Sequence, residues 1–225
     1  MKNAIKSFWA FTPLSYKLLM LFIAPMLVVL FNVVLLLGVG ELGGVLGLLI
    51  SFVSLCMLDV FSDEWVLKGF YMKSNSSLEF LQTSNKFERL IKDIVIVDMT
   101  RRILMYLFLY GAIAVIGVSV QGKEMWSAYY SIYAYFPLLM FVVSQAMLWA
   151  VRHFNSLQSM WISASMSTVV LWLAITVLTF FGAKMNYGPV YLVVVYGGLA
   201  LLAIAISVVI VGYSIKKVRD SYYDK

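Results

Sequence analysis

Long runs of apolar residues separated by short polar stretches are the main pattern along the chain. A helix needs about 20 consecutive apolar residues to cross a hydrocarbon core of roughly 30 Å, and runs of about this length recur throughout the sequence. They predict six membrane-spanning helices, at 18–37, 43–60, 103–120, 130–151, 161–182 and 190–213. The predicted fold is an all-α integral membrane protein, with residues 1–225 forming a single transmembrane domain.

The composition agrees with this prediction, and the charges orient it. Apolar residues make up 63% of the chain and charged residues 12%, whereas about a quarter of the residues are charged in soluble domains. The net charge of +6 could indicate a polyanion-binding surface, but basic residues in membrane proteins concentrate in cytoplasmic loops. If both termini are in the cytoplasm, Lys123 and Lys184 are the only lysine or arginine residues on the outer side. We therefore expect a multi-pass protein with both termini cytoplasmic and no nucleic-acid partner.

One cytoplasmic loop, residues 61–102, is far longer than the other connections. Within it Ser76 and Glu79 fit a capping box, which predicts a short helix through "SLEFLQ" that stops at "TSN". Ser84 or Asn85 can cap a second helix, which leads into the third span. The apolar residues of that second helix recur at helical spacing: Phe87, Leu90, Ile91, Ile94 and Val95.

The first 17 residues mix apolar and basic side chains ahead of the first span. Ile5, Phe8, Trp9 and Phe11 stand among lysines, a pattern typical of a helix lying in the headgroup layer. We expect an interfacial helix at 1–17. A frayed tail whose aromatic side chains enter the interface is the alternative.

Groups that could perform catalysis are scarce. The chain has one histidine, His153, and one cysteine, Cys56, and it lacks zinc-binding HExxH, nucleophilic GxSxG and phosphate-binding GxxxxGK[ST] motifs. We expect no enzyme activity and no metal site in this chain. Glu41 and Asp59 are placed at opposite ends of the second span, where we expect them to reach water. The absence of central charges in the predicted spans argues against a proton-coupled carrier.

A few uncharged polar residues enter the predicted spans, among them Ser144. Such residues either pack helices closely together or line a wet path, and both interpretations stay open. The candidates for a translocation path or a dimer face are Asn32, Gln145, Ser159, Ser163 and Ser167.

The long loop and the start of the third span carry a resemblance to a known family. The stretch "DEWVLKGFYMKSNSSLEFLQTSNKFERLIKDIVIVDMTRRIL" resembles the corresponding region in a small six-span branch of the permease subunits of type-two ATP-binding-cassette exporters. In that branch an acidic and an aromatic residue precede "LP(I/V)SR"; here "EW" at 64–65 and the segment 81–85 take these places. Gln82, Asn85 and Asp98 stand where the family has proline, arginine and lysine.

The resemblance implies that the short helix in the loop is a coupling helix, which docks on a separate ATPase subunit. The implied ATPase-coupling residues are Leu78, Glu79, Phe80, Leu81, Gln82, Thr83, Lys86 and Arg89. ATP and Mg²⁺ would be bound by the partner ATPase, and this chain would need no cofactor. The implied assembly also contains a second permease copy or a homologue and sits among the lipids of a bacterial plasma membrane, exporting a peptide, toxin or lipid-like substrate.

Two other functions fit the sequence. A stand-alone membrane protein could act in toxin immunity or sensing without transport, in which case the loop helix would simply lie on the membrane. A secondary carrier would depend on an ion gradient and not on ATP.

Overall fold

The computed structural model describes residues 2–12, 14–66, 86–122, 136–149 and 189–223. Within these residues every regular element is a helix, which confirms the all-α prediction. Three helices are long and apolar enough to cross a membrane: Leu14–Val39, Phe87–Val120 and Tyr196–Lys216. They indicate association with a membrane. The number of six spans stays a prediction, because the expected fifth span at 161–182 lies outside the described residues.

The chain begins with the short helix α1 (Lys2–Phe11), which is separated by a break from a long apolar helix. The long helix consists of α2 (Leu14–Leu18), the π-helical turn η1 (Leu19–Ile23) and α3 (Ala24–Val39). The backbone N–H of Ala24 bonds to the carbonyl of Leu19, five residues back. Pro25 follows directly, and it lacks an N–H and crowds the carbonyl four residues earlier, which accounts for the wider turn at this point.

The helices α3 and α4 (Glu41–Val66) form an antiparallel hairpin with a tight turn at Gly40. Gly40 has a φ of 69° and donates a hydrogen bond of 3.1 Å to the carbonyl of Leu36. A positive φ is readily adopted by glycine alone, which explains how the segment "GVGELGG" reverses the chain here.

Glycines on α4 also let the two arms of the hairpin approach closely. A Cβ atom added at Gly43 would overlap the backbone carbonyl of Leu35, and one added at Gly47 would meet the side chain of Asn32. Small residues at helix contacts are the usual means by which membrane helices pack closely.

The predicted second helix of the loop runs without interruption into the third span, forming the 35-residue helix α7 (Phe87–Gln121). The helix starts later than predicted, because its N-cap residue is Lys86 and not Ser84 or Asn85, and the Lys86 side chain makes no capping hydrogen bond. Phe87, Ile91 and Ile94 are buried, as their helical spacing predicts.

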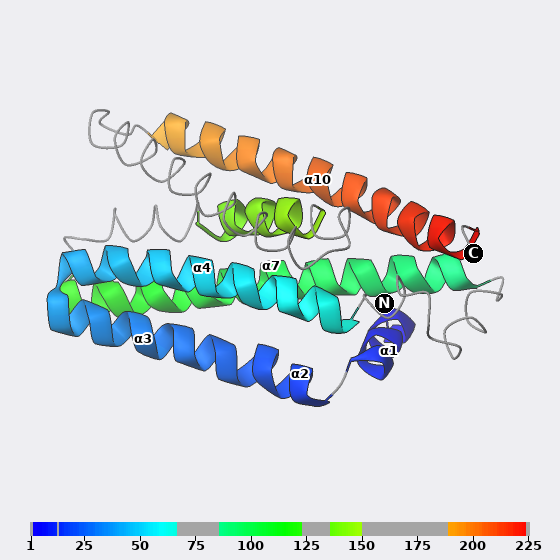
Figure 1. Cartoon of the computed structure of the whole chain (residues 1–225). Coiled ribbons are helices and arrows are strands. Elements are labelled where there is room, and N and C mark those ends of the chain that lie inside the picture. Colours follow the sequence, from blue (N-terminus) through cyan, green and yellow to red (C-terminus); the bar gives the residue numbers. More distant parts are fainter. Residues whose placement is uncertain (1, 13, 67–85, 123–135, 150–188, 224–225) are drawn as a thin grey trace.

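Two further helices complete the described part. The helix Phe136–Trp149 lies within the predicted fourth span, and α10 (Pro189–Tyr223) contains the predicted sixth. The long helices lie side by side along their length, with α1 placed across one end (Figure 1). The closest partners are α3 with α4, α1 with α7, α3 with α7, and α7 with α10. The core lies around α7, where Ile94, Tyr106 and Leu109 are fully buried.

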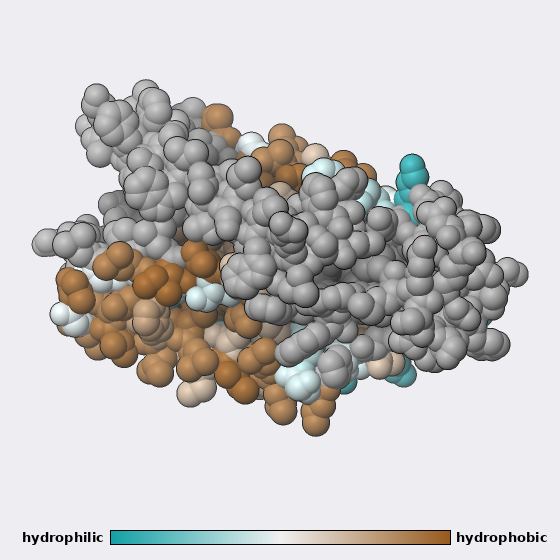
Figure 2. Space-filling view, in the orientation of Figure 1, coloured by the Kyte–Doolittle hydropathy of each residue, from teal (hydrophilic) through white to brown (hydrophobic). Residues whose placement is uncertain are grey.

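Much of the outer surface is apolar, as expected for side chains that face lipid. On α3, Met26, Leu30 and Val34 are each more than half exposed, and Leu201 and Val208 of α10 are about 70% exposed. Figure 2 shows the hydrophobic colour over α3 and along α10. The hydrophilic residues lie at the end of the molecule that holds α1 and the C-terminus. This distribution would be unfavourable in water and favourable in a bilayer.

The close approach of α3 and α4 predicts that alanine is tolerated less well at Gly43 than at Gly38. Gly43→Ala should lower the free energy of unfolding by roughly 1–3 kcal/mol, because the new methyl group meets backbone that cannot move independently. Gly38→Ala is the matched control, since nothing lies within 4 Å of a Cβ atom at Gly38. Thermal unfolding of both variants in detergent measures the difference. Equal melting temperatures would contradict the observed packing.

Candidate functional site

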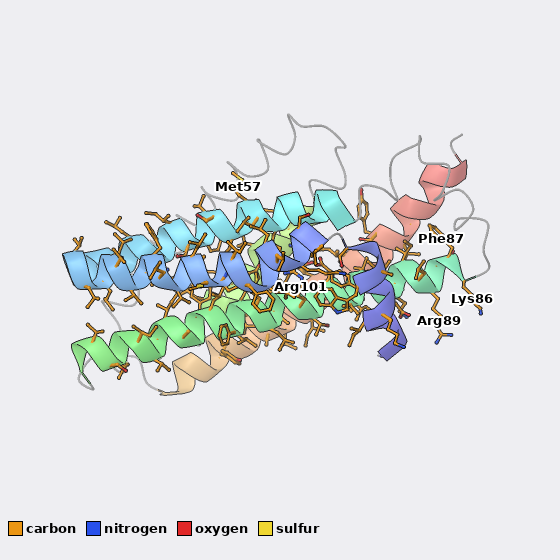
Figure 3. All side chains as sticks on the ribbon, turned by 90° about the horizontal axis from the view of Figure 1, so that it is seen from below. Met57, Lys86, Phe87, Arg89 and Arg101 are labelled. Carbon is orange, nitrogen blue, oxygen red and sulfur yellow. The ribbon has the colours of Figure 1, made fainter. Side chains whose placement is uncertain are left out.

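Most residues of the implied coupling helix lie outside the described residues. This holds for Leu78, Glu79, Phe80, Leu81, Gln82 and Thr83. Lys86 and Arg89 are described, and both are exposed at the start of α7. Figure 3 shows them at the end of α7, pointing away from the bundle, beside the buried Phe87. Their exposure makes them accessible to a partner, and their role in coupling stays a prediction.

A buried ion cluster joins α4 to α7, the helices on either side of the long loop. It consists of Asp59 on α4 and of Asp98, Arg101 and Arg102 on α7. Arg102 Nη1 lies 2.7 Å from Asp59 Oδ1, and Arg102 Nε donates to Asp98 Oδ2 over 2.7 Å. One guanidinium therefore contacts a carboxylate on its own helix and a carboxylate on the neighbouring helix.

Arg101 forms the second half of the ion cluster. Its Nη2 lies 3.0 Å from Asp98 Oδ1 and 3.9 Å from Asp59 Oδ1. Its guanidinium also lies 5.6 Å from the ring centre of Tyr16 on α2, close enough for a cation–π interaction. Figure 3 shows Arg101 in the space between α7 and the N-terminal helices. The ion cluster thus brings α2, α4 and α7 together at one level.

Burial makes these contacts strongly interdependent. Asp59 is 1% exposed and Arg102 is fully buried, so the expectation that Asp59 reaches water is wrong. A buried charge without a partner is costly, whereas two carboxylates and two guanidinium groups in contact have no net charge. Asp59 can remain buried because its contact with the Arg102 guanidinium replaces its interaction with water.

The helix α1 packs against α7. Phe8 is 1% exposed, and it meets Trp9 edge to face with ring centres 5.9 Å apart. Lys17 on α2 places its ammonium 5.3 Å from the Trp9 ring centre, which ties α1 to the start of the long helix. A helix at the N-terminus is confirmed, over Lys2–Phe11. Its placement in the headgroup layer stays a prediction.

Two of the candidate path residues are buried within this chain. Asn32 Nδ2 donates hydrogen bonds to the hydroxyl of Ser51 on α4 and to the carbonyl of Val28. Gln145 is fully buried on the helix Phe136–Trp149, and its side-chain amide has no hydrogen-bond partner within the described part of the chain. The remaining candidates, Ser159, Ser163 and Ser167, lie outside that part. The role of these residues in a translocation path or a dimer face stays a prediction.

The buried hydroxyls of Tyr106 and Tyr110 on α7 resemble Gln145 in this respect. Neither hydroxyl has a hydrogen-bond partner among the described residues. Buried polar groups are nearly always hydrogen-bonded, so such groups in the core of the bundle are candidates for contact with water or a polar ligand. These two tyrosines were missed in the sequence, where they resemble ordinary aromatic residues of a span.

The ion cluster was also missed, although part of its signal is present in the sequence. Asp98, Arg101 and Arg102 stand at i, i+3 and i+4, the spacing at which side chains on one helix meet. An acidic residue near the end of an apolar span, such as Asp59, is expected to pair with a basic residue. Within the described residues no three His, Cys, Asp or Glu side chains group as a metal site. The ion cluster connects α4 to α7 through contacts between its charged side chains.

The ion cluster predicts a strong coupling between two substitutions. Asp59→Asn should lower the free energy of unfolding by about 3 kcal/mol, because Arg102 then lacks one of its two buried carboxylates. The double variant Asp59→Asn, Arg102→Gln should lose less unfolding free energy than the sum of the losses in the two single variants. The difference should be at least about 1 kcal/mol. Unfolding of the full chain in SDS and detergent mixed micelles measures all four proteins.

Asp93→Asn is the control for this cycle, since Asp93 is a half-buried acid on the same helix outside the ion cluster. It should change the free energy of unfolding by less than about 0.5 kcal/mol. Additive effects of Asp59→Asn and Arg102→Gln would show that the pair makes no energetic contribution.

Comparisons with known protein families, with curated proteins and with solved structures found no match to this chain.

Proposed function

We propose that this chain is the transmembrane half of an ATP-driven exporter and that a separate subunit hydrolyses ATP. The ion cluster is the observation that supports this proposal most strongly. The helix α4 ends at Val66 and α7 begins at Phe87, so they flank the predicted coupling segment. Asp59 and Arg102 connect these same two helices through a buried pair at 2.7 Å.

The ion cluster is placed where it can transmit a force from that segment. At 1.5 Å per residue, Asp59 lies about 10 Å from the end of α4 and Arg102 about 22 Å from the start of α7. A push on the loop would reach both helices at their ends. Because the buried charges resist separation, α4 and α7 would tilt together, and the tilt would reach α2 and α3 through Tyr16.

The exporter would contain two ATPase subunits, which bind ATP and Mg²⁺, and a second copy of this chain or a homologue. Its place would be a bacterial plasma membrane, with both termini in the cytoplasm. An amphipathic or apolar substrate, such as a peptide, toxin or lipid-like molecule, fits a bundle whose buried charges are paired with one another. Buried polar atoms without a hydrogen-bond partner in the described part of the chain are available for such a substrate, and they include those of Asn32, Gln145, Tyr106 and Tyr110.

Two alternatives make different predictions. A stand-alone protein for toxin immunity or sensing would purify without an ATPase. A secondary carrier, which the buried acid Asp59 brings back into consideration, would move its substrate in response to an ion gradient without ATP.

The proposal predicts loss of ATPase binding when the coupling helix is altered. Phe80→Glu and Leu81→Glu should abolish recovery of a soluble ATPase with the tagged chain, because a carboxylate would replace the apolar anchor of the docking surface. Arg89→Glu should weaken recovery partially. The measurement is a mild-detergent pull-down from native membranes with mass spectrometry of the recovered subunits.

Lys216→Glu is the control for Arg89→Glu, since it makes the same kind of charge reversal at an exposed position on α10. Recovery should be unchanged. If no ATPase is recovered under conditions that preserve a known transporter complex, or if Phe80→Glu leaves recovery intact, the exporter proposal is wrong.

The proposal also predicts that the ion cluster transmits force without contributing to docking. In a purified complex reconstituted into liposomes, Asp59→Asn should leave the ATPase bound but reduce substrate export per ATP hydrolysed by at least about fivefold. The double variant Asp59→Asn, Arg102→Gln should lose less stability than the sum of the two single losses, but its coupling should stay as low as that of Asp59→Asn, since α4 and α7 remain unlinked. A purely structural role predicts that coupling follows stability across these variants, and Asp93→Asn again serves as the control.

A further inference from the structure

A groove runs along α7 and α10 on the side that holds the helix Phe136–Trp149. Its volume is about 670 Å³. The wall on α7 is a single stripe at helical spacing, formed by Lys92, Ile96, Met99, Thr100 and Ile103. Leu138 and Phe141 form its floor on the helix Phe136–Trp149, and α10 supplies the opposite wall.

The wall on α10 owes its depth to small side chains. Ala200, Ala203 and Ser207 lie among the larger residues Ile204, Val208 and Val211. The two hydroxyl groups of the lining are used within their own helices: Ser207 donates to the carbonyl of Ala203 over 2.7 Å, and Thr100 donates to that of Ile96 over 2.8 Å. The interior of the groove is therefore apolar and offers few hydrogen bonds to an occupant.

Lys92 is the charged residue of the lining, and it is exposed. Since α7 and α10 run in opposite directions (Figure 1), Lys92 lies towards the same end of the groove as Val211. No ion pair of Lys92 occurs among the described residues. The groove thus combines an apolar channel with one cation at its end.

The level of the groove matches the boundary between headgroups and hydrocarbon. The exposed residues of α7 change from Lys86, Arg89 and Lys92 to Leu104 and Phe108 along its length. From Lys92 to Ile103 the groove extends about 16 Å along the helix, so it straddles this change. A phospholipid has the same order of groups, with its phosphate beside its acyl chains.

We propose that this groove binds an anionic phospholipid of the adjacent leaflet, with one acyl chain between α7 and α10 and the phosphate beside Lys92. The apolar walls match the chain, and the Lys92 ammonium complements the negative charge. Lysine stems commonly lie along apolar surface while the ammonium stays at the headgroup level. The inference is independent of ATP-driven transport, since a lipid held here is bound whether or not the chain exports anything.

The test uses the full chain, purified with phosphatidylglycerol or with phosphatidylcholine of identical acyl chains, and native mass spectrometry of the retained lipid. Phosphatidylglycerol should be retained in preference to phosphatidylcholine. Lys92→Gln should weaken phosphatidylglycerol retention about fivefold without changing phosphatidylcholine. Ser207→Phe, which fills the middle of the groove, should abolish the retention of phosphatidylglycerol.

Two control variants separate the groove from general effects of charge and size. Lys216→Gln removes the same charge from an exposed position of α10 outside the lining, and Leu201→Phe adds bulk at a 70% exposed position of the same helix. Both should retain phosphatidylglycerol as the unaltered chain does. If Ser207→Phe does not fold, Lys92→Gln against Lys216→Gln decides the question.

Equal retention of the two lipids by the unaltered chain would overturn the proposal. So would equal losses in Lys92→Gln and Lys216→Gln, which would indicate a diffuse attraction to basic residues. A dimer mass that Ser207→Phe dissociates, without bound lipid, would assign the groove to a second copy of this chain and overturn it as well.

Discussion

The ion pair between Asp59 of α4 and Arg102 of α7 is the interaction on which this end of the helix bundle depends. Each partner is almost completely removed from solvent, so each is tolerable only while the other is in place. Arg102 also holds Asp98, and Arg101 connects the same carboxylates to Tyr16. Four charged side chains therefore connect α4 to α7, and the contact of Arg101 with Tyr16 extends this connection to α2.

The ion cluster bears on the proposed role of the long loop, because it connects α4 and α7, the two helices that flank this loop. A segment that joins two independent helices can move without consequence for the rest of the molecule, whereas a segment that joins two locked helices moves them both. The hairpin of α3 and α4 is held separately, by the turn at Gly40 and by the hydrogen bond between Asn32 and Ser51. A displacement of α4 at the ion cluster would consequently carry α3 with it, which is the behaviour needed in the proposed exporter.

The apolar exterior and the groove between α7 and α10 fit a second physical requirement, that of an apolar lipid environment. Side chains on α3 and α10 that would be buried in a soluble protein remain exposed here, because lipid tails satisfy them. Small residues on α10 leave room that the neighbouring helices do not fill. A lipid of this bilayer is the occupant that we propose for that room.

The sequence by itself determined the helical class and the membrane association, and it predicted that the second helix of the loop leads into the third span, as α7 does. These features depend on local properties, namely the length of apolar runs and helical spacing. Positions within the loop were less predictable. The N-cap of α7 is Lys86 instead of Ser84 or Asn85, and the Lys86 side chain makes no capping hydrogen bond, so the intrinsic capping preference did not decide where the helix begins. Only the tertiary structure decided that Asp59 meets Arg102 and that Asn32 meets Ser51. Pairs of this kind depend on which faces of distant helices come together, and an apolar pattern that is nearly uniform around each helix does not specify those faces.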